Sequence, residues 1–246
     1  MINKKNKSLL IIIPARLNSI RLKKKLLRNI VGTPLIIRVA QNAIKTNLAK
    51  VLVATDSRQI KKLCDKNNID SLITSKNIKS GTDRIYSAYK MLNKKFDLIV
   101  NLQGDLPIFK KDLIQKTISL FTNKKTEIGS AVCNLKESEI KDKNIVKAYV
   151  KLNKKNEGFA IDFCRSIKNR KNFYHHIGIY VYTPESLEKF VNLNQTKNEL
   201  KRSLEQMRAM DNKMMIKLIK VDSTPLSIDT KQDLKKIRLL FTKNNY

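Results

Sequence analysis

The sequence is poor in several residue types, and each shortage removes a class of protein. Its 246 residues include no Trp, 6 Gly and 5 Pro, which excludes a collagen-like chain. The three cysteines, Cys64, Cys133 and Cys164, have no C-x-x-C spacing, so the sequence offers neither a disulfide scaffold nor a zinc or redox motif. Free, mostly buried thiols in a reducing cytoplasm are the simplest expectation.

Long apolar runs are also missing. No run approaches the ~20 residues that a membrane-spanning helix needs, so we expect no membrane insertion. The N-terminal run at 9–13 is followed by Pro14-Ala15-Arg16 and is shorter than the ~7–15 apolar residues of a signal peptide. A buried parallel strand fits this run better, which agrees with a cytoplasmic protein.

Acidic residues are scarce relative to basic ones. The chain has 21 Asp and Glu against 51 Lys and Arg, a formal net charge of +30. Such a balance can indicate nucleic-acid binding, because basic side chains release counterions from phosphates. Here, however, 40 of the cations are scattered Lys, and only 6% of the residues are aromatic. Specific recognition favours Arg and stacking aromatics, so nucleic-acid binding is the less favoured interpretation.

What is present is an alternation of strand-like and helix-like segments. Short apolar runs at 9–13, 51–54, 71–74 and 98–102 predict strands. Helical spacing of apolar residues predicts helices after Pro34, around Ile60, from Gly81 and over 113–121. This order predicts an α/β fold with a mostly parallel, Rossmann-like sheet that is covered by helices.

The pattern changes near residue 128. Strand-like runs follow at 128–135, 145–152, 158–163, 177–182 and 214–221, with a polar hairpin connection at 153–158. Helices are expected after Pro184, around 199–210 and over 231–241, where Thr230 and Asp233 resemble a helix N-cap. No repeat or linker divides the chain, so we expect a single domain over 1–246 with a β-rich insertion at about 128–200.

Polar clusters follow the predicted strands, at the carboxyl ends where open parallel sheets bind ligands. The segment 16–25 holds five cations, among them Arg16, Arg21 and Lys25, but it lacks the glycines of a Walker loop. Side-chain charge could hold phosphates there, although an exposed basic turn explains these residues equally well.

Three further segments allow either a ligand site or an ordinary turn. In the segment 80–84, Thr82 could cap a helix and Arg84 could bind an anion, unless Arg84 is a surface residue. Asp105, at the end of a predicted strand, could hold a divalent cation or belong to a plain turn. Asp229 could be a second metal carboxylate or part of a helix cap.

The only histidines, His175 and His176, are adjacent in the chain. Neighbouring residues of a strand point to opposite faces, so only one of them can enter a given site. We therefore expect no His-rich metal site, and either a hydrogen bond to a polar ligand or a structural role for that residue.

Taken together, these clusters and their order resemble the 3-deoxy-manno-octulosonate cytidylyltransferase (CMP-Kdo synthetase) family over about residues 9–237. The matching segments are Ile13-Pro14-Ala15-Arg16 with Ser19, Arg21, Leu22 and Lys25, Ala54-Thr55-Asp56, Ser80-Gly81-Thr82-Asp83-Arg84, Gln103-Gly104-Asp105, Phe163 with Arg165, His176-Ile177-Gly178-Ile179-Tyr180, Leu204-Glu205-Gln206-Met207-Arg208, and Asp229-Thr230 with Asp233-Leu234. Each motif alone is weak, but their common order is highly specific.

The resemblance implies a nucleotidyltransferase that is cytoplasmic, depends on Mg²⁺ and is generally a homodimer, with the β-rich part used for dimerisation. Such an enzyme transfers CMP from CTP to the anomeric hydroxyl of Kdo, an acidic eight-carbon sugar, and releases pyrophosphate. The product, CMP-Kdo, supplies lipopolysaccharide biosynthesis.

The resemblance also assigns roles by position. The residues implied in catalysis are Arg16, Lys25, Asp105 and Asp229, and the two aspartates would bind Mg²⁺. The nucleotide would lie against Ala15, Arg16, Arg21, Lys25, Ser80, Gly81, Gly104 and Asp105. The sugar would lie against Arg84, Gln103, Arg165, His176, Tyr180, Glu205 and Gln206.

The chain departs from the family pattern at several places. The family loop usually has the sequence Ser-Thr-Arg-Leu-Pro-Gly-Lys, and this chain has Ile20, Lys23 and Lys24 at three of those positions. The usual Gly-Asp-Glu-Pro has Leu106 in place of Glu, so any hydrogen bond or metal contact of that Glu is absent. These departures keep open another acidic sugar, such as an amino-substituted Kdo analogue or a sialic-acid type.

Overall fold

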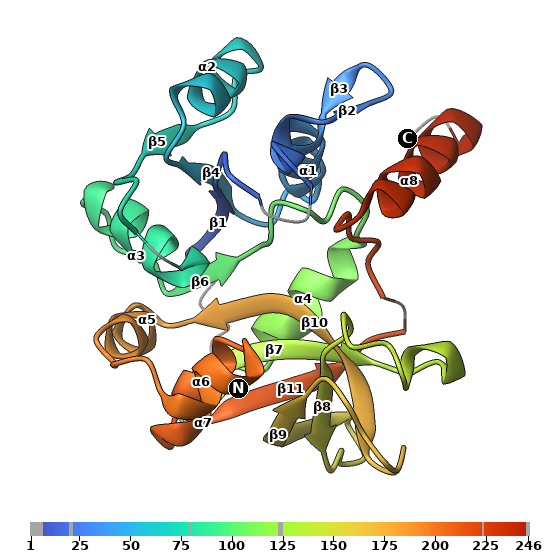
Figure 1. Cartoon of the computed structure of the whole chain (residues 1–246). Coiled ribbons are helices and arrows are strands. Elements are labelled where there is room, and N and C mark those ends of the chain that lie inside the picture. Colours follow the sequence, from blue (N-terminus) through green and yellow to red (C-terminus); the bar gives the residue numbers. More distant parts are fainter. Residues whose placement is uncertain (1–6, 20–21, 79, 123–124, 223, 245–246) are drawn as a thin grey trace. The chain divides into compact units, whose positions relative to one another are not determined.

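A computed structural model describes residues 7–19, 22–78, 80–122, 125–222 and 224–244 (Figure 1). The chain forms two compact units, of which the first comprises Met1–Phe109 with Pro225–Tyr246 and the second comprises Lys110–Thr224. The C-terminal helix therefore belongs to the same unit as the first strand. The β-rich part that the sequence predicted at about 128–200 lies within the second unit.

The first unit is built on a parallel sheet, as the alternating pattern predicted. Its strands are β1 (Leu9–Ala15), β4 (Lys50–Thr55), β5 (Ser71–Ile73) and β6 (Leu98–Asn101). β1 pairs in parallel with β4 and β6, and β4 pairs in parallel with β5. Residues 10–13 of β1 are fully buried, because a central strand of a covered sheet needs apolar side chains on both faces.

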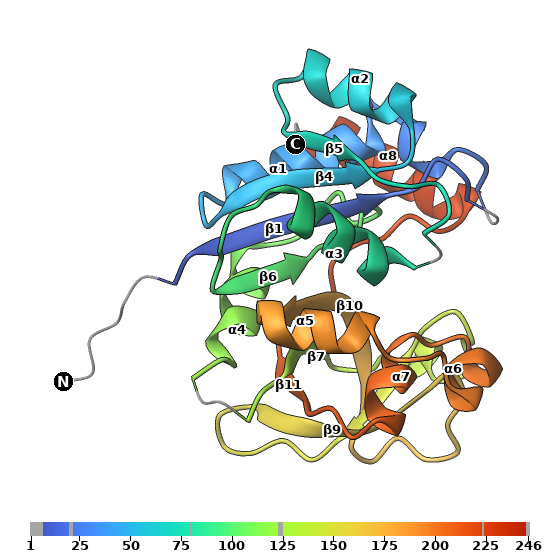
Figure 2. The same ribbon diagram turned by 90° about the vertical axis from the view of Figure 1, so that its left-hand side faces the viewer.

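Helices cover both faces of this sheet. They are α1 (Leu35–Lys45), α2 (Arg58–Lys66) and α3 (Gly81–Met91), which contact its strands. The C-terminal helix α8 (Lys231–Asn244) belongs to the same unit. Figures 1 and 2 show α1 and α3 on opposite sides of β4 and β1. The predicted N-cap of α8 is confirmed, because Thr230 Oγ1 accepts from the Asp233 N–H at 3.1 Å and an Asp233 carboxylate oxygen accepts from the Thr230 N–H at 2.8 Å. A small hairpin, β2 (Asn29–Ile30) and β3 (Thr33–Pro34), precedes α1.

The second unit contains a mixed sheet. Its strands are β7 (Ile128–Cys133), β8 (Lys147–Val150), β9 (Glu157–Cys164), β10 (Phe173–Tyr182) and β11 (Ile216–Lys220). β7 pairs in parallel with β11 and antiparallel with β10, and β9 joins β11 to β8 through antiparallel pairs. The start of β10 also pairs antiparallel with β8, so β10 contacts both β7 and β8. The predicted hairpin between β8 and β9 is confirmed.

The helices of the second unit are α4 (Lys111–Ser119), α5 (Pro184–Val191), α6 (Lys197–Arg202) and α7 (Gln206–Asp211), together with the 3₁₀ helix η2 (Glu137–Glu139). The single helix predicted over 199–210 is wrong. The helix breaks at Ser203, whose φ is +52°. The Arg165 guanidinium holds this break, donating to the carbonyls of Arg202 at 3.3 Å and of Ser203 at 3.2 Å. Apolar spacing along 199–210 carries no information about this distant donor. Within the part of the chain that the structure describes, no helix has the length and apolar character to cross a membrane.

Candidate active site

The predicted phosphate loop follows β1 in the first unit. Arg16 comes directly after the strand, and the loop ends in the short 3₁₀ helix η1 (Lys25–Leu27). Lys24 has φ +53°, a left-handed conformation that favours Gly, and it stands where the resembling family has Gly. The loop thus makes a Gly-type turn before Lys25 although Gly is absent. Arg21 lies outside the described residues, so its nucleotide contact stays a prediction.

Lys25 lies between the two aspartates that the sequence predicted as metal ligands. Its Nζ donates to Asp105 Oδ2 at 2.7 Å and to Asp229 Oδ1 at 3.1 Å. Burial lowers the pKa of Lys25, but the two neighbouring carboxylates outweigh burial, so the pKa is raised overall. The structure therefore brings three of the four predicted catalytic residues together, from positions far apart in the sequence.

Backbone contacts place the two aspartates side by side. The Ile228 N–H donates to the Asp105 carbonyl at 3.0 Å, and Ile108 and Leu226 form an antiparallel bridge next to it. A Cβ added at Gly104 would lie 3.2 Å from the Pro14 carbonyl oxygen, so glycine lets this turn approach the end of β1 closely.

The neighbouring Leu106, where the family has Glu, is only 5% exposed. Its side chain belongs to the apolar core of the first unit. The departure from the family pattern thus adds an apolar contact to this turn and leaves Asp105 in place.

The two carboxylates suit a Mg²⁺ ion that is shared with a substrate. Because both contact one ammonium, oxygens of Asp105 and Asp229 converge on a single point. Among the residues that the structure describes, no group of three or more His, Cys, Asp or Glu could hold a metal ion. Mg²⁺ typically takes one or two protein carboxylates and completes its shell with water and substrate phosphates. The arrangement therefore fits Mg²⁺ bound together with a nucleotide better than a metal held by protein alone.

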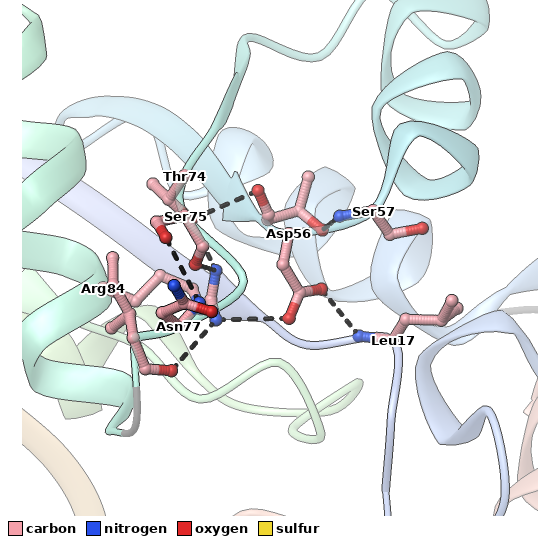
Figure 3. A network of polar contacts seen from close by, with 9 residues as sticks. Leu17, Asp56, Ser57, Thr74, Ser75, Asn77 and Arg84 are labelled. Carbon is pink, nitrogen blue, oxygen red and sulfur yellow. Dashed lines mark hydrogen bonds and ion pairs between the residues drawn. The ribbon is translucent and has the colours of Figure 1, made fainter.

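Arg84 belongs to a second polar cluster at the carboxyl ends of the first unit's strands (Figure 3). It lies in the first turn of α3 and is fully buried, so the alternative of a surface residue is wrong. Its Nη2 contacts Asp56 Oδ2 at 3.2 Å, and its Nη1 donates to Thr74 Oγ1. Burial lowers the pKa of Arg84, Asp56 raises it, and the nearby charge of Arg16 lowers it further.

Arg16 carries a hydrogen-bond donor that the protein leaves unused. Its Nη2 is buried and has no hydrogen-bond partner among the described residues. A buried donor of this kind costs free energy unless a ligand or water satisfies it. The predicted role of Arg16 in holding an anion is consistent with this free donor.

Ser80, rather than Thr82, caps α3. The Ser80 hydroxyl accepts from the Asp83 N–H at 2.9 Å, whereas the Thr82 side chain is buried. A Cβ added at Gly81 would lie 3.6 Å from the Pro14 side chain, which is an ordinary contact. The predicted contacts of Ser80 and Gly81 with the nucleotide stay predictions.

The predicted sugar-binding residues are divided between the two units. Arg84 and Gln103 belong to the first unit, where Gln103 Nε2 donates to Asn101 Oδ1 at 3.1 Å. Five others belong to the second unit: Arg165, His176, Tyr180, Glu205 and Gln206.

His176 is buried and electrically neutral near pH 7. Its Nε2 lies 2.9 Å from Ser130 Oγ, and its ring meets the Phe163 ring edge-on at 4.9 Å. Burial, with a smaller effect from His175, lowers the pKa of His176 to about 3. Ser130 Oγ also donates to the Ile179 carbonyl at 2.7 Å. Its oxygen can therefore accept a hydrogen bond from the neutral His176 tautomer that carries its proton on Nε2. This supports the structural role that the sequence left open and does not test a contact with sugar.

Tyr180 and Gln206 are joined across the second unit. The Tyr180 hydroxyl donates to Gln206 Oε1 at 3.4 Å, and the Tyr180 ring lies 5.6 Å from that of His176. Burial, and then the nearby charge of Glu205, raises the pKa of Tyr180 well above its ordinary value. Tyr180 and His176 are therefore hydrogen-bonding groups at neutral pH, and neither is suited to proton transfer there.

Arg165 uses its guanidinium to hold backbone carbonyls. Besides the two carbonyls at the helix break, its Nη1 donates to those of Lys143 at 3.0 Å and Asn144 at 3.3 Å. The Arg165 carbonyl in turn accepts from the fully buried Lys147 at 2.9 Å. Sequence pattern alone does not single out Lys147, because a Lys in an alternating strand is normally expected on the solvent face.

Buried ion pairing also escaped the sequence reasoning. Arg208 forms a two-point pair with Glu199, with Nε–Oε2 at 2.9 Å and Nη2–Oε1 at 2.7 Å. The sequence predicted one continuous helix around 199–210 and made no prediction about a partner for Glu199. The break between α6 and α7 turns the two residues toward each other, so only the tertiary structure could show the pair.

Comparisons with known proteins give one consistent result. A sequence profile of the Cytidylyltransferase family matches residues 10–218. The 3-deoxy-manno-octulosonate cytidylyltransferase of Bartonella henselae is 38% identical over 234 residues, covering 93% of this chain and 96% of its own. That of Rickettsia prowazekii is 39% identical over 236 residues, covering 94% of each chain. A solved CMP:2-keto-3-deoxy-manno-octonic acid synthetase complexed with CTP superposes with a TM-score of 0.85 at 29% identity, over 96% of this chain and 99% of that one.

Proposed function

This chain belongs to the 3-deoxy-manno-octulosonate cytidylyltransferase family, and we propose that it transfers CMP from CTP to the anomeric hydroxyl of Kdo, with Mg²⁺ held by Asp105 and Asp229. The proposed Mg²⁺ site is supported by one observation: the carboxylates of Asp105 and Asp229 both contact the Lys25 ammonium. The remaining steps follow from the charges that the reaction must bring together.

The reaction joins two anions. The sugar hydroxyl attacks the α-phosphorus of CTP, a new oxygen–phosphorus bond forms, and the bond to the β-phosphate oxygen breaks, so pyrophosphate leaves. The phosphates are negatively charged, and the sugar that carries the attacking hydroxyl has a negative carboxylate. Cations must therefore offset the charge of the phosphates and that of the sugar carboxylate. Arg16, with its unused Nη2, and Lys25 are suited to phosphate oxygens.

Lys25 must exchange partners when the nucleotide binds. Its ammonium holds Asp105 and Asp229, so it leaves these carboxylates as it turns toward the phosphates. When bound there, Mg²⁺ would polarise the phosphate and lower the pKa of the attacking hydroxyl. Neither Tyr180 nor His176 is suited to take up the proton of that hydroxyl at neutral pH, and we propose that the proton passes to water.

The sugar half of the reaction depends on hydrogen bonds. Tyr180 and His176 are neutral at pH 7, so each offers directed hydrogen bonds without adding charge. Arg165 carries a positive charge but engages backbone carbonyls, so it shapes the segment around the Ser203 break. We propose that Arg165, His176, Tyr180, Glu205 and Gln206 line the sugar site of the second unit. The sugar contacts of Arg84 and Gln103, which belong to the first unit, stay predictions from the family resemblance.

Pyrophosphate release tests the function and the metal site together. The wild-type protein should release pyrophosphate only when CTP, Mg²⁺ and Kdo are all present. Asp105→Ala and Asp229→Ala should stay folded and lose at least about 100-fold in kcat, because removing a metal ligand removes transition-state charge stabilisation. The matched control is Asp70→Ala, since Asp70 is 59% exposed and pairs with Lys50 in the same unit. Wild-type turnover from either active-site variant would remove that residue from the proposed metal site.

A panel of acidic sugars tests the substrate. Kdo should be preferred over an amino-substituted Kdo analogue and over sialic acid. Retained CTP dependence with rejection of Kdo would assign the chain to another acidic sugar. Binding of single-stranded or duplex nucleic acid with steep salt dependence and no pyrophosphate release would support the nucleic-acid alternative instead.

We further propose that the enzyme works in the cytoplasm as a homodimer and supplies CMP-Kdo to lipopolysaccharide biosynthesis. The proposed dimer uses strands of the second unit, where Ile161 of β9 is 48% exposed. Light scattering on the purified protein should give the mass of two chains. Ile161→Lys should shift the measured mass toward that of one chain. Burying a charge in an apolar interface costs free energy, which the same charge does not cost where it is exposed to solvent.

A further inference from the structure

Asp56 lies at the centre of the polar cluster in Figure 3 and has no part in the proposed chemistry. It directly follows β4, at the carboxyl end of the parallel sheet. Its two carboxylate oxygens have different partners. Oδ1 accepts from the Leu17 N–H at 3.1 Å, and Oδ2 contacts Arg84 Nη2 at 3.2 Å.

These two contacts join three loops of the first unit. Leu17 is the neighbour of Arg16 in the loop after β1. Arg84, in the first turn of α3, also donates to Thr74 Oγ1 and to the Ser75 carbonyl at 3.4 Å, both in the segment after β5. Asp56 is therefore the carboxylate through which the phosphate loop is tied to β4, to α3 and to the segment after β5.

Charge gives Asp56 a second effect. Arg16 and Arg84 are near enough that the charge of Arg16 lowers the pKa of Arg84. Two neighbouring guanidinium groups repel each other, and Arg84 has no solvent exposure to weaken the repulsion. The Asp56 carboxylate, with a side chain 16% exposed, offsets one of these charges. Arg16 can then stay beside Arg84 while its Nη2 has no hydrogen-bond partner in the part of the chain that the structure describes.

We propose that Asp56 is a positioning residue for the nucleotide phosphates, which fixes the Leu17 amide and neutralises Arg84 so that Arg16 presents its free Nη2 to a phosphate oxygen. This inference rests on the proposed function, because CTP is taken to be the ligand of Arg16. It adds a residue that acts on phosphate binding through Arg16 without touching the nucleotide.

Asp56→Asn is the sharpest test, because the change is isosteric. The Leu17 N–H and the Arg84 guanidinium contact different carboxylate oxygens, and an amide replaces one of these acceptors by an NH2 donor, so one of the two contacts is lost. The variant also removes the negative charge between the two arginines. Asp56→Glu is the conservative companion, which keeps the charge but lengthens the side chain. The matched control is Asp65→Asn, because Asp65 forms an exposed ion pair with Lys61 in α2.

Asp56→Asn should raise the KM for CTP about tenfold while kcat and the KM for Kdo change less than about threefold. Calorimetry with CTP in the absence of sugar should show the same loss of affinity. Asp56→Glu should lose less CTP affinity than Asp56→Asn, because it still offsets the charge of Arg84. Asp65→Asn should match the wild type. If Asp56→Asn fails to fold, the comparison of Asp56→Glu with Asp65→Asn carries the test.

Three results would overturn the inference. Unchanged CTP affinity in both Asp56 variants would show that Arg16 needs no support. A rise in the KM for Kdo alone would show that Asp56 acts through Arg84 on the sugar. A lower Tm with an equal loss of both substrates would show a purely structural role. Calorimetry distinguishes a failure of this inference from a failure of the proposed function, because it measures CTP binding without turnover. The proposed function fails if the wild type binds CTP but releases no pyrophosphate with Kdo.

Discussion

At the scale of single residues, the position of Lys25 matters most for how the metal binds. A positive charge within hydrogen-bonding distance of both proposed ligands must repel an approaching cation. In the proposed complex, the nucleotide phosphates would give Lys25 another partner and so relieve this repulsion. Mg²⁺ and CTP should therefore bind cooperatively, each improving the affinity for the other.

Lys25→Met tests this competition without nucleotide. The variant keeps an unbranched side chain and removes the charge, so it should bind Mn²⁺ at least about tenfold more tightly than the wild type in calorimetry. Lys23→Met is the control, because Lys23 is an exposed cation of the same loop. Equal Mn²⁺ affinities in the wild type and Lys25→Met would contradict the competition.

The lowered pKa of His176 predicts how the stability of the protein depends on pH. Its folded-state pKa of about 3 lies below the ordinary value of 6.5, so between these limits the unfolded chain binds the extra proton. The contribution of His176 to the free energy of unfolding is constant above pH 6.5. As the pH falls below that value, this contribution decreases by about 1.4 kcal/mol per pH unit.

Urea unfolding at pH 7 and pH 5 measures this loss. In His176→Gln the dependence on pH over this window should be reduced, although the variant is less stable overall because the Gln does not fill the ring's place. An unaltered pH dependence in His176→Gln would mean that other groups cause it.

At the scale of elements, one side chain decides where the helix after 196 ends. Arg165 supplies donors to the carbonyls of Arg202 and Ser203, and the chain turns there into a left-handed residue. The break lets Glu199 of α6 meet Arg208 of α7. Loop carbonyls at 143 and 144 depend on the same guanidinium.

Arg165→Met should therefore loosen α6 and α7. The hydrogen bond to the Arg202 carbonyl is half-buried and the other three are exposed, so losing the donor should cost about 1 kcal/mol, and amide hydrogen exchange over 197–211 should become faster. Arg170→Met is the matched control, since Arg170 is 57% exposed and its pair with Glu137 should contribute less than about 1 kcal/mol. Exchange rates equal to those of the control would mean that the break persists without Arg165.

At the scale of the whole molecule, the net charge of +30 opposes compaction. Like charges on one surface repel each other, and salt screens them over a Debye length of about 10 Å at 0.1 M. Few cations lie in the site, where Lys25 and Arg84 have carboxylate partners. The excess is therefore a property of the surface rather than of catalysis.

Raising NaCl from about 20 to 300 mM should increase the Tm by several degrees, because screening removes self-repulsion. Betaine at equal osmolality is the control for effects of the solute that do not depend on charge. A Tm that is independent of salt, or that falls with it, would show that specific ion pairs outweigh the net repulsion.

Much of the element order could be predicted because it depends on local pattern. Period-two and period-3.6 spacing placed the parallel strands of the first unit, the helices between them and the N-cap of α8 correctly. The same reasoning allowed Thr82 as a helix cap and missed the break at Ser203. It also left open whether Arg84 is a surface residue or binds an anion. In these cases a neighbour far along the chain decided the outcome, and no local pattern records such a neighbour.

The sequence by itself determined the family, the parallel strands and the identity of the charged residues that follow them. Only the tertiary structure decided that Lys25, Asp105 and Asp229 meet at one point, and that Asp56 joins the Arg16 loop to Arg84. The physical reason is that side-chain type and spacing are properties of a chain segment, whereas hydrogen bonds and ion pairs extend only a few ångströms. They exist only where folding brings distant segments together.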